Sequence, residues 1–223
     1  MRVKETSVYQ FDELSDKAKE RAREWYRDAS QGDEWWDCTY YRIQDAAKYL
    51  GIEIDTTTRK HIGGYTKDGT WNPNKKTQHT EPCIYFSGFS SQGDGACFYG
   101  TWKAEHMKTL EELKADFGDD SKLYALHSAL WAYKEQYPSS WCTSTRYSSH
   151  YSHERSTTLE AVLDEEIDYN EKDCKPLEEC LVRFMQWMYR QLEAEYDYRN
   201  SDEQIDENIT ANEYEFTEDG KRF

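Results

Sequence analysis

Two strand signals flank one turn in residues 83–102, which read CIYFSGFSSQGDGACFYGTW. Apolar and aromatic residues fill 83–89 and 96–102, as is typical of strands. Asp94 and Gly95 lie between the two runs, and an Asp-Gly pair favours a tight hairpin turn because glycine accepts a positive φ. The sequence therefore predicts a central β-hairpin within residues 83–104.

Apolar residues at helical spacing precede this hairpin. They predict one helix over about 15–29, capped by Ser15, and a second over about 36–50 that ends at Gly51. We expect the two helices to pack antiparallel, as an N-terminal helix pair within residues 13–51.

Helical spacing returns after the hairpin. It predicts a helix over about 121–137, capped by Ser121, and a long helix that starts at Pro176, because proline suits the first helical position. A capping box that begins at Ser201 opens a short last helix. Residues 175–211 are therefore predicted to be an acidic helical part.

Strand signals complete the pattern. Residues 52–55 alternate between apolar and polar side chains, and residues 141–163 indicate two strands that turn near His153. Residues 63–82 are rich in turn formers and are predicted to be a loop or a ragged hairpin, and the polar tail after Tyr214 is predicted to be extended. The sequence thus predicts an α+β fold, an antiparallel sheet of four to five strands packed with flanking α-helices, in a single domain spanning 1–223.

The net charge of −16 is unevenly distributed along the chain. Residues 1–150 hold 23 acids and 20 bases, whereas residues 151–223 hold 21 acids and 8 bases, a balance of −13. This sign disfavours direct binding to nucleic-acid phosphates. It indicates either a solvated face or a surface for a basic partner. The candidate partner-binding residues are Asp164, Glu165, Glu166, Asp168, Glu193, Glu195, Asp197, Asp202, Glu203, Asp206 and Glu207.

The sequence favours a cytoplasmic location and reduced cysteines. It contains neither an apolar run of about 18 residues nor an apolar segment of the kind found in secretory signals, so we expect no membrane association. The six cysteines form no C-x-x-C pair, and His150 and His153 form an H-x-x-H without an adjacent glutamate. We therefore expect free thiols, no metal site and no cofactor.

The glycine-rich turn is a possible ligand loop. Gly93 and Gly95 can adopt a positive φ and expose backbone N–H groups to an anion, with positive charge supplied by Lys60, Lys67, Lys75 and Lys76. The alternative is an ordinary hairpin turn, since no Walker A pattern is present. The residues of this possible loop are Ser87, Ser90, Ser91, Gln92, Gly93, Asp94 and Gly95.

Candidates for nucleophilic catalysis exist, but no motif joins them. Ser90, Ser91 and Cys97 could act as nucleophiles with His150 or His153 as the base, yet G-x-S-x-G is absent. We therefore assign no catalytic residue, and enzymatic activity is the less favoured alternative.

Three segments together resemble a known family. They are YQFDELS at 9–15, IYFSGFSSQGDGACF at 84–98, and YRQLEAEY at 189–196, which continues to NEYEF at 212–216. They resemble a family of acidic proteins from phages and prophages, some labelled antitoxin-like, and residues 57–81 look like an insertion in that pattern. The resemblance implies a mobile-element origin and names no catalytic residue.

Two main functional hypotheses follow. The first is an acidic interaction protein that binds and inhibits a basic host protein or nucleoprotein complex, such as a defence complex, with nucleic-acid mimicry as one mode of binding. The second is a small-ligand or nucleotide-binding module, or a hydrolase, centred on the hairpin at 87–95. The resemblance adds a third, an antitoxin-like partner of a toxin.

Overall fold

The structure is a computed structural model that describes residues 6–32, 34–146, 152–163 and 170–223. The sequence predicts one domain, whereas the structure divides the chain into two compact units. Unit 1 combines Met1–Asp37 with Leu192–Phe223, and unit 2 is Cys38–Gln191. The two helices that we expected to pair therefore belong to different units, α1 (Asp16–Ser30) to unit 1 and nearly all of α2 (Asp37–Tyr49) to unit 2.

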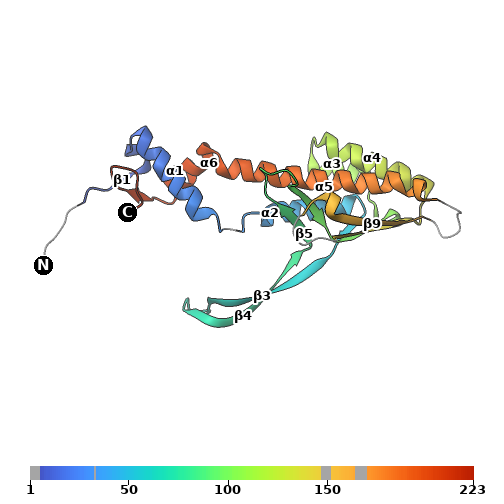
Figure 1. The fold of residues 1–223 in the computed structure, drawn as a ribbon, viewed down its shortest axis with the longest axis horizontal. Helices are drawn as coiled ribbons and strands as arrows, with labels where there is room; N and C mark the ends of the chain where they lie inside the picture. Colours follow the sequence, from blue (N-terminus) through green and yellow to red (C-terminus); the bar gives the residue numbers. More distant parts are fainter. Residues whose placement is uncertain (1–5, 33, 147–151, 164–169) are drawn as a thin grey trace. The chain divides into compact units, whose positions relative to one another are not determined.

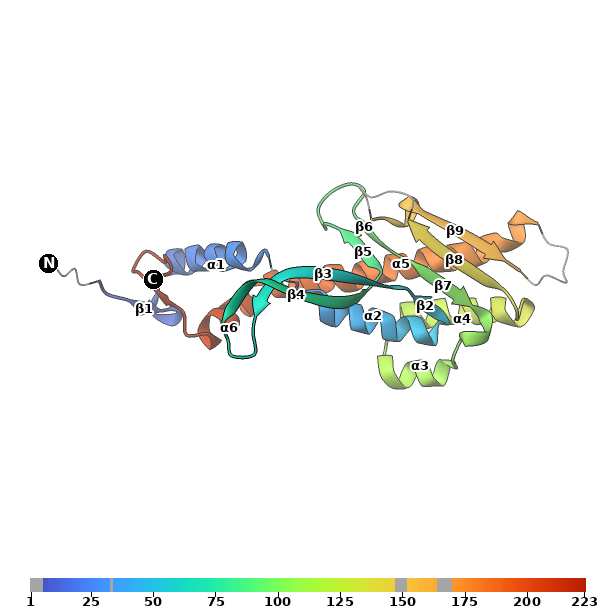
Figure 2. The ribbon, with the colours of Figure 1, turned by 90° about the horizontal axis from the view of Figure 1, so that it is seen from below.

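Unit 2 contains a four-stranded antiparallel sheet, which confirms the predicted α+β fold (Figures 1 and 2). Its strands lie in the order β2-β7-β8-β9. Their bounds are Ile52–Ile54 for β2, Gly100–Lys103 for β7, Trp141–Arg146 for β8 and Thr157–Val162 for β9. Gly100 allows β7 to approach β2, because a Cβ at this position would lie 2.2 Å from the carbonyl oxygen of Glu53.

The central hairpin is present, but its second strand is divided. β5 (Ile84–Ser87) pairs with β6 (Gly95–Phe98), and the chain then enters the four-stranded sheet as β7. Tyr99 lies at the division, where its N–H donates to the carbonyl of Cys83 and its own carbonyl accepts from Asp55. The run that looks like one strand in the sequence therefore serves two sheets.

Residues 63–82 are more regular than the sequence indicates. β3 (Thr56–Tyr65) and β4 (Trp71–Pro82) form a two-stranded antiparallel ribbon with one irregularity between Ile62 and Gly64. We call residues Thr56–Pro82 the ribbon; Figure 1 shows it as a separate pair of strands.

Helices cover the sheet of unit 2. They are α2, α3 (Leu110–Phe117), α4 (Ser121–Gln136) and the first two thirds of α5 (Glu171–Asn200), which lies beside α4 in both views (Figures 1 and 2). Phe184 of α5 is fully buried and packs edge-to-face on Phe98 of β6, with ring centroids 5.6 Å apart. The indole N–H of Trp102 donates to the carbonyl of Leu50 at 2.8 Å and so ties β7 to the end of α2.

Two helix starts differ from the predictions. Asp120, not Ser121, caps α4, because its Oδ1 accepts the N–H of Leu123 at 2.9 Å. α5 begins at Glu171, so Pro176 lies inside the helix. Asn170 explains this earlier start: its Oδ1 accepts the N–H of Lys172, and its own N–H donates to the carboxylate of Asp173.

Unit 1 is built from both parts of the chain that flank unit 2. α1 packs with α6 (Asp202–Ala211), and the short strands β1 (Tyr9–Gln10) and β10 (Glu215–Phe216) pair antiparallel. Phe216 is fully buried, so the tail that we predicted to be only extended supplies a core residue. The core of unit 1 consists of Phe11, Leu14, Ala18, Ala22, Ile205, Ile209 and Phe216.

None of the helices in the described ranges combines the length and the apolar composition that crossing a bilayer requires.

Candidate functional site

A cleft of about 740 Å³ lies within unit 2. Its walls are the end of the hairpin loop, the 3-10 turn at Glu154–Ser156, the first turns of α4, and one face of α5. The charged and hydrogen-bonding side chains that line it include Asp94, Asp120, Lys122, His153, Glu154, Arg183, Gln186, Trp187 and Arg190.

At the cleft, the hairpin loop is held by hydrogen bonds between its own residues. Oδ2 of Asp94 accepts the backbone N–H groups of Ser90 at 2.9 Å and of Ser91 at 2.7 Å. Gly93 has a φ of 101°, whereas Gly95 already belongs to β6 and is not left-handed, so the turn does not lie at Asp94-Gly95. Two backbone N–H groups of the loop that we considered for an anion, those of Ser90 and Ser91, are therefore occupied by the chain's own carboxylate, whereas our expectation concerned the N–H groups exposed by Gly93 and Gly95.

His153 fixes the other wall of the cleft. A Cβ on Gly95 would lie 2.8 Å from Cδ2 of His153, so the absence of a side chain at 95 lets the imidazole pack on the hairpin. Nδ1 of His153 lies 3.0 Å from the N–H of Arg155 and 2.9 Å from Oε2 of Glu154. Oε1 of Glu154 accepts from the amide of Gln186 at 3.3 Å, which joins this wall to α5.

The carboxylates of the cleft are all bound by donors of unit 2. Besides Asp94 and Glu154, Asp120 accepts the N–H of Leu123 and, through Oδ2, the indole N–H of Trp187 at 2.8 Å. These neutral donors occupy the carboxylate oxygens, while each carboxylate keeps its negative charge.

Two cations of the cleft, Lys122 and Arg183, are accessible to a ligand. Lys122 and Arg183 are exposed, and within the described part of the chain neither forms a hydrogen bond or an ion pair. Arg190 also lines the cleft, with its guanidinium 5.7 Å from the ring centre of Tyr189. The cleft therefore offers the exposed cations Lys122 and Arg183 to a ligand, while the hydrogen-bond acceptors of its carboxylates are already occupied.

Among the described residues, the candidates for nucleophilic catalysis show no hydrogen bond between a nucleophile and a histidine base. Cys97 is fully buried, and burial raises the pKa of its thiol to about 11, which is the reverse of what a reactive cysteine needs. Ser90, Ser91 and Gln92 are exposed on the loop, Ser87 is half-buried, and His150 lies outside the described residues. Within the described residues no group of three or more histidine, cysteine or acidic side chains is arranged to hold a metal ion.

The basic residues of the cleft differ from those expected. Lys60, Lys67, Lys75 and Lys76 lie on the ribbon and do not line the cleft. Its cations come from helices instead, and our sequence reasoning missed them. A signal was present on α5, because Arg183, Gln186 and Arg190 follow one another at steps of three and four, which places them on one helix face.

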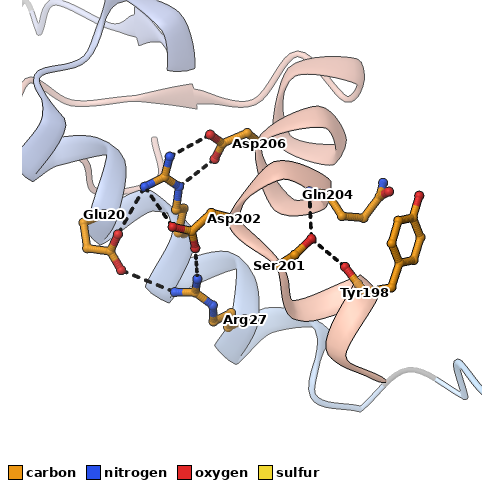
Figure 3. A network of polar contacts seen from close by, with 8 residues as sticks. Glu20, Arg27, Tyr198, Ser201, Asp202, Gln204 and Asp206 are labelled. Atoms are coloured by element: carbon orange, nitrogen blue, oxygen red, sulfur yellow. Dashed lines mark hydrogen bonds and ion pairs between the residues drawn. The ribbon is translucent and has the colours of Figure 1, made fainter. Parts of the chain in front are cut away.

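Two of the predicted acidic residues stabilise unit 1 itself (Figure 3). Asp206 accepts two hydrogen bonds from Arg23, each 2.7 Å long, and Asp202 pairs with Arg27 and Arg23. The bidentate contact with Asp206 raises the pKa of Arg23 above its usual value. Both carboxylates are therefore already engaged in holding α6 on α1.

The other acidic residues divide into three groups. Asp164, Glu165, Glu166 and Asp168 lie outside the described residues. Glu195 pairs with Arg199 at 3.8 Å, and Glu193 is half-buried. Asp197, Glu203 and Glu207 are exposed and form no ion pair with any described residue. We call these last three residues the acidic surface of unit 1.

One comparison with known proteins matched a family. Residues 35–202 match a domain of unknown function, DUF8835. Neither the comparison with curated proteins nor the comparison with solved structures found a match. The matched range includes all of unit 2 and so every residue of the cleft. The chain therefore belongs to the DUF8835 family.

Proposed function

We propose that unit 2 binds a small anionic ligand in the cleft, with a phosphate group as the anion that fits best. The observation that carries the proposal is the hydrogen bonding of the cleft: the carboxylates of Asp94, Asp120 and Glu154 are bound by donors of unit 2, whereas Lys122 and Arg183 form no hydrogen bond or ion pair with any described residue. A planar guanidinium binds phosphate oxygens in pairs, and a volume of about 740 Å³ accommodates a ligand as large as a nucleotide.

Thermal unfolding with a small ligand panel tests this proposal. The panel is inorganic phosphate, a nucleoside monophosphate and the matching uncharged nucleoside. At a ligand concentration of about 100 times Kd, binding stabilises the native state by about 2.7 kcal/mol. We expect a rise in Tm with a phosphorylated ligand and a much smaller rise in Arg183→Gln.

The matched control is Lys175→Gln, which removes one exposed positive charge from the same helix at a position that does not line the cleft. It should retain the full ligand-induced shift. An equal shift in Arg183→Gln and the wild type, or no shift with any phosphorylated compound, would show that the cleft is not an anion site.

We also propose that the acidic surface of unit 1 binds a basic protein partner. α6 supports this, since it carries four acidic residues and no basic one, and its contacts with α1 hold Glu203 and Glu207 on a fixed helix. In finer detail, we propose that the partner is a host defence complex, that the surface mimics nucleic acid and that the protein is of phage origin. The alternative is an antitoxin-like role as the partner of a toxin.

The test is the binding rate of a fluorescent peptide rich in lysine and arginine. Neutralising Asp197, Glu203 and Glu207 should slow association, and added salt should have the same effect on the wild type. Asp206 must be left intact, because its removal would break the pair with Arg23. A control that neutralises the exposed Glu111, Asp119 and Glu179 of unit 2 should bind like the wild type; equal loss in both variants would reject the proposed surface.

A further inference from the structure

The two strands of the ribbon form a sheet of their own. Within the described residues β3 and β4 pair only with each other, so each has an outer edge of backbone groups without a strand partner. Two-stranded ribbons are marginally stable alone in water. Yet Ile62, Tyr65 and Trp71 are 75%, 67% and 56% exposed. This combination is typical of a segment that another surface covers.

The ribbon also has the opposite charge to the rest of the chain. It contains five basic residues and two acidic ones, Asp68 and Glu81, a balance of +3 in a chain of −16. Glu81 pairs with Arg59, and Asp68 accepts hydrogen bonds from Thr66 and Thr70. Lys60, Lys67 and Lys76 form no ion pair with any residue that the structure describes.

The part of unit 1 that contains the acidic surface has the complementary composition. Residues 192–223 hold 11 acids and 3 bases, a balance of −8. Tyr196 and Tyr198, which neighbour Asp197 in the chain, are 40% and 58% exposed. Unit 1 thus offers exposed aromatic area and exposed carboxylates, and the ribbon offers exposed aromatic and aliphatic area and exposed ammonium groups.

We propose that the ribbon of one copy docks on the acidic surface of a second copy, and that the exchange is reciprocal. A reciprocal exchange closes into a two-fold dimer, because the same pair of surfaces meets twice. The inference rests on the proposed binding role of the acidic surface and names its partner as a second copy of this chain.

Sedimentation velocity with a charge exchange tests the dimer. The first variant carries Lys60→Glu, Lys67→Glu and Lys76→Glu; the second carries Asp197→Lys, Glu203→Lys and Glu207→Lys. We expect a wild-type dimer that dissociates as salt is added. Each variant alone should be monomeric, because like charges then face each other in both contacts.

An equimolar mixture of the two variants should form a dimer again, because both contacts in that heterodimer join opposite charges. Circular dichroism of each variant checks that it is folded. A monomeric wild type, or a mixture that stays monomeric while both variants are folded, overturns the inference. Binding of a single-stranded oligonucleotide by a monomeric wild type, lost in the first variant, would assign the ribbon to nucleic acid and also overturn it.

Different results reject the dimer and the binding role of the acidic surface. If the wild type is monomeric but its acidic surface still binds the basic peptide, the dimer is rejected and the binding role stands. If the second variant binds the peptide as well as the wild type does, the binding role is rejected.

Discussion

Gly95 shows how one residue connects the hairpin with the cleft. A Cβ there would lie 2.8 Å from Cδ2 of His153 and 3.1 Å from its Cα, and the backbone atom cannot rotate away. We expect Gly95→Ala to lower the free energy of unfolding by about 1–3 kcal/mol, the usual cost of overpacking. Urea denaturation measures this.

The matched control is Gly32→Ala, since no atom lies within 4 Å of a Cβ at Gly32 and its φ is not positive. This change should be neutral or should stabilise by about 0.4–1 kcal/mol. Equal stability of the Gly95 and Gly32 variants would contradict the packing of His153 on the hairpin.

The buried cysteines predict a loss of stability at alkaline pH. Burial raises the pKa of Cys142 to about 12 from the ordinary value of 9.0. A raised thiol pKa means that the unfolded chain ionises first, so the contribution is complete below about pH 9 and is lost as the pH rises toward 12. Cys142→Ala should therefore show a weaker decline in unfolding free energy between pH 8 and pH 10.5 than the wild type.

Cys38 is the control, because it is exposed while the other five cysteines are buried. Cys38→Ala should decline like the wild type. In the native protein at neutral pH, a thiol reagent should modify Cys38 quickly and the other five slowly, and denaturant should expose all six. Rapid modification of several thiols in the folded protein would contradict their burial.

Among the elements, α5 makes the largest contribution to the core of unit 2. Phe184 is fully buried on this helix and packs on Phe98. Phe184→Ala should lower the unfolding free energy by about 3–5 kcal/mol, the range for a buried phenylalanine. Glu179→Ala, at an exposed position on the same helix, should change it by less than about 0.5 kcal/mol. A loss below about 0.5 kcal/mol for Phe184→Ala would contradict the burial of this face of α5 in the core of unit 2.

The elements also show which predictions the sequence supports. Ser15 and Ser201 cap their helices as predicted, because capping depends on side chains within three residues. The start of α5 was wrong for a local reason too: Asn170 and Asp173 form a cap whose signal is weaker than that of Pro176. Tyr99 is different, since the division of its strand depends on hydrogen bonds with Cys83 and Asp55.

At the scale of the whole molecule, long-range packing decides what the sequence could not show. The burial of Phe216 depends on contacts with Phe11 and α1, which are far away in the chain. The pairing of Asp206 with Arg23 likewise joins residues 183 positions apart. The cleft likewise gathers Asp94, Lys122, His153 and Arg183 from four separate segments. Local patterns identify such residues singly, but only the fold shows that internal donors bind the carboxylates and that Lys122 and Arg183 have no ion-pair partner among the described residues.

The assembly of unit 1 from both flanking parts of the chain sets an order for its synthesis. α1 leaves the ribosome before unit 2 does, and Asp206 is added 183 residues after its partner Arg23. At about 5–20 residues per second, that delay is roughly 10–40 s. During this time all of unit 2 is translated, while the apolar face of α1 with Ala18 and Ala22 lacks its partner helix. Until α6 and Phe216 have been made, the apolar face of α1 therefore stays uncovered, which makes α1 a segment that a chaperone can bind during translation.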